Sequence, residues 1–344
     1  FLNLVMKICL GTGFEGKKFN IRQFKSILKF SAISGIKFID TADNYKKGKV
    51  QKIIGSNINL KNNKIKILNK FVFINNLTTL NKNLDQSLKN LKVDAIDIYM
   101  PHWPTNNYDT DNLIFFLNQK IKEGKIKNFG LSNFSLRQIK DIKKKFKKRL
   151  FLQFELNFSN FHYNNKLISF INKNNIKSFC YGIGYNYPIK NEILSKLNKK
   201  FNFSEYESSL AWMSQMRNIT PIIQSSKLEN LERNFNIIKR FKNKKINISN
   251  KIQNNIVSIK IDEIIKINSK SGVVYKSLKE AIMNYKNIFP SPLDIADEIK
   301  KNGMIKPLFF RRKNKGYELI SGQARYWAYR IVKPDTKFIK GILV

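Results

Sequence analysis

The sequence predicts a closed (β/α)8 barrel followed by a small α+β domain. Two observations lead to this fold class. Apolar strand-like runs alternate with amphipathic helix-like stretches from residue 7 to about residue 240, and this alternation stops after Lys245. Eight strand–helix units in roughly 240 residues are what a closed parallel barrel of the TIM type requires. We expect the barrel in residues 1–245, a polar Asn-rich linker in 246–255 and a second domain in 256–344.

The expected elements of the barrel follow in chain order. Strands are expected at residues 7–12, 37–42, 64–71, 95–102, 126–132, 151–157, 177–183 and 220–225. Helices are expected near residues 22–34, 48–57, 77–91, 111–123, 135–146, 164–174, 205–217 and 227–240. Asp111, Ser135 and Ser204 are expected to cap helices, because a side-chain oxygen at that place accepts a hydrogen bond from a first-turn amide.

An open doubly wound sheet is the alternative arrangement of such units. Residues 11–16 (Gly-Thr-Gly-Phe-Glu-Gly) carry glycines at the offsets of a dinucleotide fingerprint. However, no helix pattern starts there, and no acidic residue ends a following strand in the way that the fingerprint requires. The closed barrel is therefore favoured.

The last hundred residues follow a different order. We expect a strand at 256–260, a short helix near 261–267 and a helix at 292–302. Apolar segments at 303–311 and 317–322 follow, and a further helix opens at Gln323. This mixture of elements predicts a small α+β domain.

Charge and cysteine content restrict the classes of partner. The formal net charge is +40, but only ten of the 64 basic residues are Arg, and Lys, Asn and Ile are frequent throughout. An A/T-rich coding sequence explains this mixture, and binding to nucleic acid is kept as the weaker alternative. No apolar run of about 18 residues is present, so no membrane span is expected. Cys9 and Cys180 lie in apolar runs and are expected as buried thiols of a cytoplasmic protein.

Four ionisable side chains lie at or just after the ends of neighbouring predicted strands: Asp40, Tyr45, Lys70 and His102. In a parallel barrel the carboxyl ends of the strands share one face, where active sites sit. A phenol, an ammonium, a carboxylate and an imidazole at one mouth can form a proton donor of adjustable strength. Such chemistry suits carbonyl reduction, and no metal ligand set is expected.

Six motifs in order resemble the aldo-keto reductase family across residues 7–240. They are residues 35–45 (Gly-Ile-Lys-Phe-Ile-Asp-Thr-Ala-Asp-Asn-Tyr), 84–91 (Leu-Asp-Gln-Ser-Leu-Lys-Asn-Leu), 94–99 (Asp-Ala-Ile-Asp-Ile-Tyr), 102–104 (His-Trp-Pro), 124–126 (Gly-Lys-Ile) and 130–134 (Gly-Leu-Ser-Asn-Phe). The resemblance implies that Tyr45 is the general acid and that Lys70, held by Asp40, places positive charge beside it. It implies that His102 directs the substrate carbonyl. Lys46 and Gln51 depart from the residues Gly and Glu that are common in relatives.

The same resemblance implies a nicotinamide cofactor. Ser132, Asn133 and Gln153 would hold the carboxamide, and Tyr181 would stack on the nicotinamide ring. The segment after the last strand would grip the adenosine end, with Ser226, Lys227 and Asn234 as contacts, and Thr12 is included in the cofactor site. A positive charge at a helix N-terminus suits a 2′-phosphate, so NADPH is expected, with NADH as the alternative.

The C-terminal domain resembles the ParB/sulfiredoxin-like nucleotide-binding domains. The similarity lies in residues 303–307 (Gly-Met-Ile-Lys-Pro) and 321–328 (Ser-Gly-Gln-Ala-Arg-Tyr-Trp-Ala). It implies a nucleotide or phosphate site at Gly322, Gln323 and Arg325, because a glycine at a helix N-terminus lets phosphate approach backbone amides. Ala324 departs from the paired arginines of the DNA-partition branch, and the motif lacks the nucleophilic cysteine that sulfinic acid reduction needs.

The expected function is therefore reduction of an aldehyde or ketone with a nicotinamide cofactor. A sugar or a nucleotide-linked sugar is the candidate small-molecule substrate. The alternative is an inactive barrel that serves as a scaffold, with a nucleotide-sensing or DNA-associated C-terminal domain.

Overall fold

The protein is described by a computed structural model that covers residues 7–13, 20–72, 76–104, 109–158, 160–184, 192–241, 256–268, 274–284, 291–304 and 306–344. The expected linker, 246–255, lies outside these residues. The chain divides into two compact units, which are treated separately below. The first comprises Phe1–Asn157, Leu167–Gly184 and Lys196–Ile248, and the second comprises Phe158–Lys166, Tyr185–Ser195 and Ser249–Val344.

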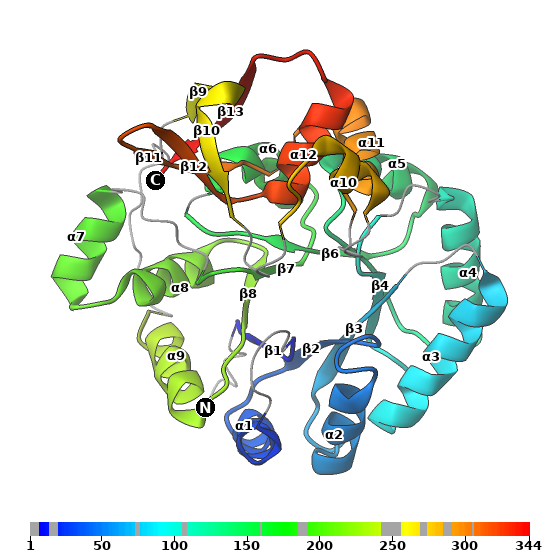
Figure 1. Ribbon diagram of the computed structural model, residues 1–344. Helices are drawn as coiled ribbons and strands as arrows, with labels where there is room; N and C mark the ends of the chain where they lie inside the picture. Colours follow the sequence, from blue (N-terminus) through cyan, green and yellow to red (C-terminus); the bar gives the residue numbers. More distant parts are fainter. Residues whose placement is uncertain are drawn as a thin grey trace. The chain divides into compact units, whose positions relative to one another are not determined.

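Eight parallel strands of the first unit close into a barrel, as expected (Figure 1). They are β1 (Cys9–Gly11), β2 (Phe38–Ala42), β3 (Lys66–Phe71), β4 (Ile98–Pro101), β5 (Phe129–Ser132), β6 (Leu150–Glu155), β7 (Ser178–Tyr181) and β8 (Ile219–Ile223). Closure occurs where β1 pairs with β8, with Cys9 opposite Ile222 and Leu10 opposite Ile223. The open doubly wound alternative is therefore excluded.

Helices follow the strands along the chain and surround the ring of strands in Figure 1. They are α1 (Ile21–Ile33), α2 (Lys49–Asn57), α3 (Leu77–Leu91), α4 (Thr110–Lys122), α5 (Leu136–Lys145), α6 (Phe161–Lys173), α7 (Glu192–Phe201), α8 (Glu205–Gln215) and α9 (Leu228–Phe241). Ser135 and Ser204 cap α5 and α8 as predicted, each in a capping box. Asp109 rather than Asp111 caps α4, because its Oδ1 accepts hydrogen bonds from the amides of Asp111 and Asn112.

The interior of the barrel is filled by apolar side chains from seven of its strands. This cluster consists of Cys9, Phe38, Leu68, Ile98, Met100, Phe151, Phe179 and Ile222. On β5 the residue is Gly130, and an added Cβ there would lie 2.8 Å from Met100 Cε. Glycine at this position lets Met100 occupy the space beside β5. The barrel is thus a packed core, on which the polar groups described below rest.

Observed strands are mostly shorter than the predicted ones. The clearest case is the predicted strand 95–102, where Ile96 forms an isolated bridge to Ile126 before β4 begins at Ile98. Between them, the Asp97 carboxylate accepts hydrogen bonds from the Ile67 amide at 3.0 Å and from Lys127 Nζ at 2.9 Å. Side-chain bonds therefore interrupt the strand ladder at a place that apolar patterning alone does not reveal.

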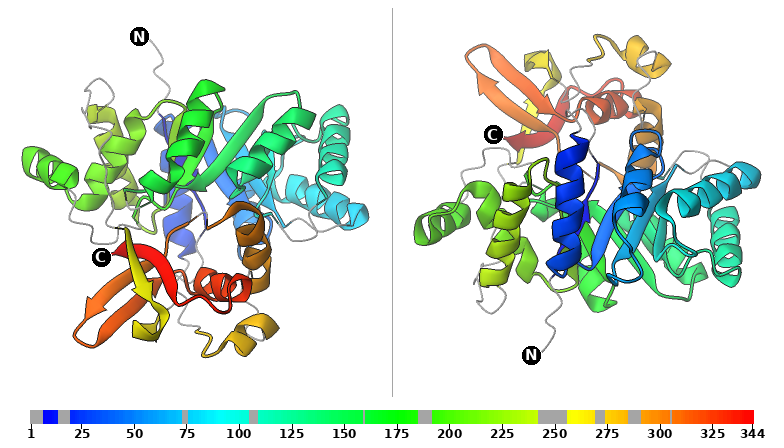
Figure 2. Two further views of the ribbon diagram at one scale, coloured as in Figure 1. Left: turned by 90° about the horizontal axis from the view of Figure 1, so that it is seen from above. Right: turned by 90° about the horizontal axis from the view of Figure 1, so that it is seen from below.

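The second unit contains a five-stranded mixed sheet in the order β10-β12-β11-β13-β9. Its strands are β9 (Ile256–Lys260), β10 (Ile264–Ile267), β11 (Phe309–Lys313), β12 (Gly316–Ser321) and β13 (Phe338–Leu343). Strands β11 and β12 form an antiparallel hairpin that can be followed in orange in Figure 2. The helices are α10 (Leu278–Met283), α11 (Pro292–Asn302) and α12 (Gln323–Val332).

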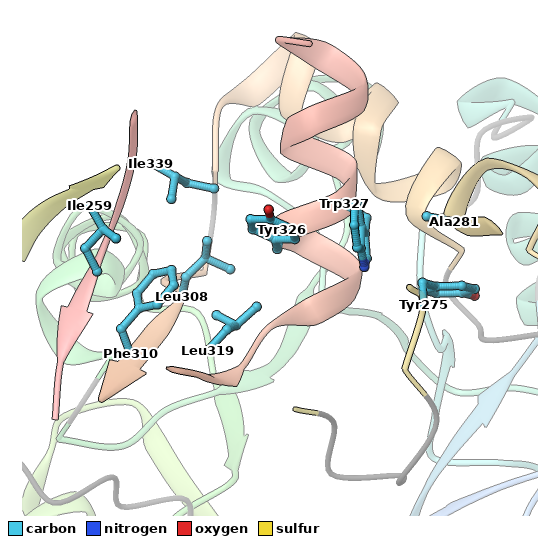
Figure 3. Close-up of a cluster of buried hydrophobic side chains, with 9 residues drawn as sticks. All are labelled: Ile259, Tyr275, Ala281, Leu308, Phe310, Leu319, Tyr326, Trp327 and Ile339. Atoms are coloured by element: carbon cyan, nitrogen blue, oxygen red, sulfur yellow. The ribbon is translucent and has the colours of Figure 1, made fainter. Parts of the chain in front are cut away.

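One face of this sheet packs on the helices through a single apolar cluster. Its members are Ile259, Tyr275, Ala281, Leu308, Phe310, Leu319, Tyr326, Trp327 and Ile339 (Figure 3). Phe310 packs against Gly341 of the neighbouring strand so closely that an added Cβ would lie 2.5 Å from its ring atoms. The second unit therefore has a hydrophobic core of its own.

Some expected elements were wrong or incomplete. Residues 261–263 form a 3-10 turn, η1 (Ile261–Glu263), and the rest of the predicted helix 261–267 is strand β10, which pairs with β12. Helices α7 and α10 and strand β13 were not predicted. Cys9 and Cys180 are buried free thiols, as expected. Within the described residues, no helix is long and apolar enough to cross a membrane.

Candidate active site

A buried ion pair joins two neighbouring strands near their carboxyl ends. Lys70 Nζ on β3 lies 2.6 Å from Asp40 Oδ1 on β2, and the residues are only 1% and 5% exposed. Burial by itself lowers the pKa of Lys70, but the charges of Asp40 and Tyr45 and their hydrogen bonds outweigh burial, so the net pKa is raised. Lys70 is therefore held as an ammonium inside the barrel.

Tyr45 lies on the loop between β2 and α2, directly beside this ammonium. Lys70 Nζ is 5.1 Å from the centroid of the Tyr45 ring. The ring also meets His102 edge to face, with centroids 5.9 Å apart and an interplanar angle of 74°. The phenol also lies close to Gly13, where an added Cβ would be 3.0 Å from the phenol oxygen. The loop after β1 can approach the phenol this closely only because residue 13 lacks a side chain.

His102 follows β4 and is the third aromatic or cationic group at this end of the barrel. Its amide donates a hydrogen bond to the Phe71 carbonyl at 2.9 Å, and its ring stacks on Trp103 at 5.5 Å. Burial, reinforced by the charge of Lys70, lowers the pKa of His102 to about 3. The imidazole is thus neutral at physiological pH, and its buried Nδ1 has no hydrogen-bond partner among the described residues.

A chain of amide and hydroxyl groups extends from Asp40 across β5, β6 and β7. Gln153 Nε2 donates to Asp40 Oδ1 at 2.7 Å, and Ser132 Oγ donates to Gln153 Oε1 at 3.2 Å. Asn133 Nδ2 donates to Ser132 Oγ at 3.0 Å, and Tyr181 Oη donates to Asn133 Oδ1 at 2.6 Å. The predicted carboxamide-binding residues therefore form one connected network with the catalytic candidates.

Asn133 and Thr12 tie this network to the backbone. Asn133 adopts a positive φ of 66°, which asparagine tolerates, and its Nδ2 also donates to the His102 carbonyl at 3.1 Å. Thr12 is fully buried, and its Oγ1 donates to the Asp40 carbonyl at 2.8 Å. The Thr12 hydroxyl thus holds the strand that carries Asp40.

The residues expected at the adenosine end lie around the start of α9. Ser226 and Lys227 are exposed, and the Lys227 amide donates to Ser225 Oγ at 3.2 Å. Asn234 is buried: its Nδ2 donates to Tyr206 Oη at 3.2 Å, while its Oδ1 has no partner in the covered part of the chain. A buried acceptor without a donor is costly unless a ligand supplies one.

In the second unit, Gly322 precedes α12 with a φ of 104°, which favours glycine. An added Cβ at Gly322 would lie 3.0 Å from Arg325 Nη2, so the guanidinium lies against the glycine backbone. Gln323 is buried, and its Oε1 accepts a hydrogen bond from the Tyr275 amide at 3.2 Å. The Gln323 side chain therefore serves the fold of this unit.

No functional role was expected for Asp43, Gly13 or Trp103. The carboxyl of Asp43 has a pKa raised from its ordinary 3.8 to about 6, mainly because of burial, and its Oδ1 has no partner among the described residues. All three lie inside sequence motifs, at 11–16, 35–45 and 102–104, so their place in the chain was a signal. Their contacts with Tyr45, His102 and Lys70 required the folded chain.

Comparison with known proteins identifies the barrel. The model for the aldo/keto reductase family matches residues 7–183, which is more than half of the chain. The chain belongs to the aldo/keto reductase family. The family match ends at residue 183, before Tyr185–Ser195 and Ser249–Val344 of the second unit, so the ParB/sulfiredoxin-like interpretation of residues 256–344 remains a prediction. Among the covered residues, no group of three or more His, Cys, Asp or Glu side chains could hold a metal ion.

Curated family members are distant in sequence. Methylglyoxal reductase DkgB of Escherichia coli O157:H7 is 25% identical over 215 residues, which span 61% of this chain and 79% of that protein. Aldo-keto reductase YhdN of Bacillus subtilis is 28% identical over 116 residues, 30% of this chain and 35% of that protein. The second match therefore spans only about a third of its relative.

Solved structures of the family share the fold. The thermostable aldo-keto reductase Tm1743, in complex with epalrestat, has a TM-score of 0.62 at 22% identity and covers 72% of this chain and 92% of that chain. An aldo/keto reductase from Klebsiella pneumoniae, in complex with NADP and acetate, has a TM-score of 0.60 at 18% identity over 71% and 87% of the two chains. At these identities the likeness concerns the fold.

Proposed function

We propose that this aldo/keto reductase reduces an aldehyde or ketone with NADPH, with Tyr45 as the general acid. The observation that carries the proposal is the buried Lys70–Asp40 pair at 2.6 Å beside the Tyr45 ring. Replacing a buried pair with apolar residues of similar size often costs no stability, so stability alone does not explain this pair. Proton donation to a carbonyl oxygen is a function that uses all three groups.

The role of Lys70 follows from charge. When Tyr45 gives its proton to the substrate oxygen, a phenolate remains, and the adjacent ammonium stabilises it. Asp40 fixes the position of the ammonium and is itself fixed by Gln153 at 2.7 Å. Because the pair is buried, its electrostatic effect on the phenol is only weakly screened by water.

His102 acts as a neutral group in this proposal. Its pKa of about 3 keeps a second positive charge away from Lys70. A neutral imidazole can donate one hydrogen bond to a carbonyl oxygen and so set the direction of the substrate. Stacking on Trp103 restricts the orientation of the imidazole ring.

The residues of the barrel fit NADPH. The amides of Asn133 and Gln153, with Ser132, would hold its carboxamide, and the half-buried Tyr181 ring would lie against its nicotinamide. The orphaned acceptor Asn234 Oδ1 suits an amino group of adenine, and the exposed Lys227 and Ser226 suit a 2′-phosphate. When bound, NADPH supplies the hydride. NADP and NADPH complexes of structurally similar reductases support this choice.

The substrate class we propose is a small aldehyde or ketone. Several relatives are named methylglyoxal reductases, which supports a short dicarbonyl compound as a first test. A sugar or nucleotide-linked sugar is the further substrate that the sequence suggested, and the same assay can include it.

NADPH oxidation with a panel of methylglyoxal, simple aldehydes, aldoses and nucleotide-linked sugars tests this function. Tyr45→Phe is expected to lower kcat/KM by about 10²–10⁴-fold, because the general acid is lost. The matched control is Tyr99→Phe, which removes a buried hydroxyl that has no hydrogen-bond partner in the covered residues and keeps the ring stacked on Phe71. Equal rates of NADPH oxidation for the wild type and Tyr45→Phe, or no NADPH binding, would contradict the proposal.

The second unit has one observation in favour of a phosphate ligand. The Arg325 guanidinium lies against Gly322, at the N-terminus of α12, where backbone amides point out of the helix. We therefore propose a nucleotide as a ligand of this unit. Titration of the full chain with ATP, comparing the wild type with Arg325→Gln, tests it, and identical binding curves would contradict it. A chain that binds ATP but reduces no carbonyl would instead favour the scaffold function.

A further inference from the structure

One cavity of the barrel unit lies away from the candidate active site. Its volume is about 740 Å³. It is lined by the end of α2 and its connection to β3, by the first residues of β3, by the connection between α3 and β4, and by Lys127. Since the strands are parallel, this places the cavity at their amino ends, whereas Asp40, Lys70 and His102 lie toward the carboxyl ends.

The lining of this cavity is strongly basic. It contains Lys61, Lys64, Lys66, Lys92 and Lys127. Lys127 is paired with Asp97 at 2.9 Å, and the Asp97 carboxylate is also bound to the Ile67 amide. The other four lysines form no ion pair within the described residues, and all four are exposed. The cavity thus gathers cations from three separate parts of the chain.

The negative groups near the cavity do not cancel the positive charge of these four lysines. Helices α2 and α3 end beside the cavity, at Asn57 and Leu91, and each helix C-terminus carries about half a negative charge. Asp94 is the remaining carboxylate of the lining. When Asp94 and both helix ends are set against the four lysines, an excess of roughly two positive charges remains. A dianion would neutralise it.

The cavity also offers apolar surface. Ile58, Leu60 and Ile65 belong to the lining, and the small part of each residue that stays exposed contributes to its wall. A volume of this size suits a small organic molecule rather than an isolated inorganic ion. The ligand that matches both features carries a doubly charged group on an apolar or weakly polar body.

We propose that this cavity is a binding site for a small phosphomonoester. The dianionic phosphate would be held by Lys64 and Lys66, with Lys61 and Lys92 close by in the lining, and the organic group would cover the apolar wall. The site is independent of the reductase function, because none of the residues proposed for proton transfer or for NADPH belongs to its lining.

Phenyl phosphate is the probe, measured by isothermal titration calorimetry on the full chain at moderate ionic strength. We expect saturable binding to one site, at least about tenfold tighter than inorganic phosphate, with no saturable binding of phenol. The double variant Lys64→Gln/Lys66→Gln is expected to weaken binding at least about tenfold, because two charge-assisted contacts are lost. The single variant Lys66→Gln gives the same test if the double variant is poorly folded.

The matched control is Lys147→Gln/Lys148→Gln. These lysines precede β6 at the same end of the barrel, are exposed and lie outside the cavity lining. The control removes the same charge and is expected to change binding by less than about twofold. An equal loss in both double variants would show that only net charge matters and would overturn the proposal. Loss of phenyl phosphate binding in the presence of saturating NADPH, or binding of poly(U) without binding of phenyl phosphate, would overturn it as well.

Discussion

The two ends of the barrel differ in whether their charged side chains are paired. At the carboxyl ends, Lys70 and Asp40 are buried and paired, and Gln153 links Asp40 to a connected network of amides and hydroxyls. At the amino ends, Lys61, Lys64, Lys66 and Lys92 are exposed and have no carboxylate partner among the described residues. Charges that the protein itself compensates should matter for stability, and charges left uncompensated should matter for binding.

Among the variants considered, Lys70→Met is expected to have the largest effect on stability. It leaves Asp40 buried without its partner, so we expect a loss of about 3–5 kcal/mol in the free energy of unfolding. The double variant Asp40→Leu/Lys70→Met should recover most of this stability, because both charges are gone, yet remain inactive. Urea unfolding and NADPH oxidation measure the two effects. A double variant as unstable as the single one would contradict the explanation by charge burial.

The pH dependence of stability tests the two perturbed groups at the carboxyl ends. The pKa of Asp43 is raised from 3.8 to about 6, so the folded state binds its proton more tightly than the unfolded state. The stabilising contribution of Asp43 to the free energy of unfolding is therefore fully present below pH 3.8 and is lost as the pH rises through about 6. Asp43→Asn should remove this loss of stability, worth about 3 kcal/mol, in urea unfolding curves across that window.

His102 should act with the opposite sign. The pKa of His102 is lowered from 6.5 to about 3. Its stabilising contribution to the free energy of unfolding is therefore fully present above pH 6.5 and is lost as the pH falls toward 3. His102→Gln should flatten that decline and leave the effect of Asp43 in place. If neither variant changed the pH profile, the burial of these two groups would not be coupled to folding.

Asp97 differs from the unpaired lysines at the amino ends, because its carboxylate accepts hydrogen bonds from the Ile67 amide and Lys127. Asp97→Ala should lower the free energy of unfolding by about 1–2 kcal/mol, since the Ile67 amide and Lys127 both lose an acceptor. Asp97→Asn can keep the bond to the amide and should cost less. Thermal unfolding of both variants separates the hydrogen bond from the ion pair, and equal costs would assign the whole effect to Lys127.

The smallest effect is expected for the unpaired lysines. Lys64→Gln/Lys66→Gln should change the free energy of unfolding by less than about 0.5 kcal/mol, because exposed charges without partners contribute little to stability. Urea unfolding measures it. A loss comparable to that of Lys70→Met would show that the two ends do not differ in the way described here.

The alternation of apolar runs was sufficient to predict eight strands and the barrel that they form. It did not predict α7, although apolar residues recur at 193, 197 and 201. It also assigned helix to residues 264–267, which are strand because β12 supplies a hydrogen-bonding partner. Pairing partners of this kind are distant in the sequence and leave no local pattern.

The sequence by itself determined which ionisable residues end neighbouring strands, because strand order and the period of the pattern place Asp40, Lys70 and His102 at one end of a parallel barrel. Only the tertiary structure decided their protonation states and the pairing of their charges. The neutral His102, the raised pKa of Asp43 and the uncompensated lysines at the other end depend on burial and on distances of a few ångströms. Solvent exclusion and Coulomb interactions are set by spatial neighbours, and those neighbours come from separate parts of the chain.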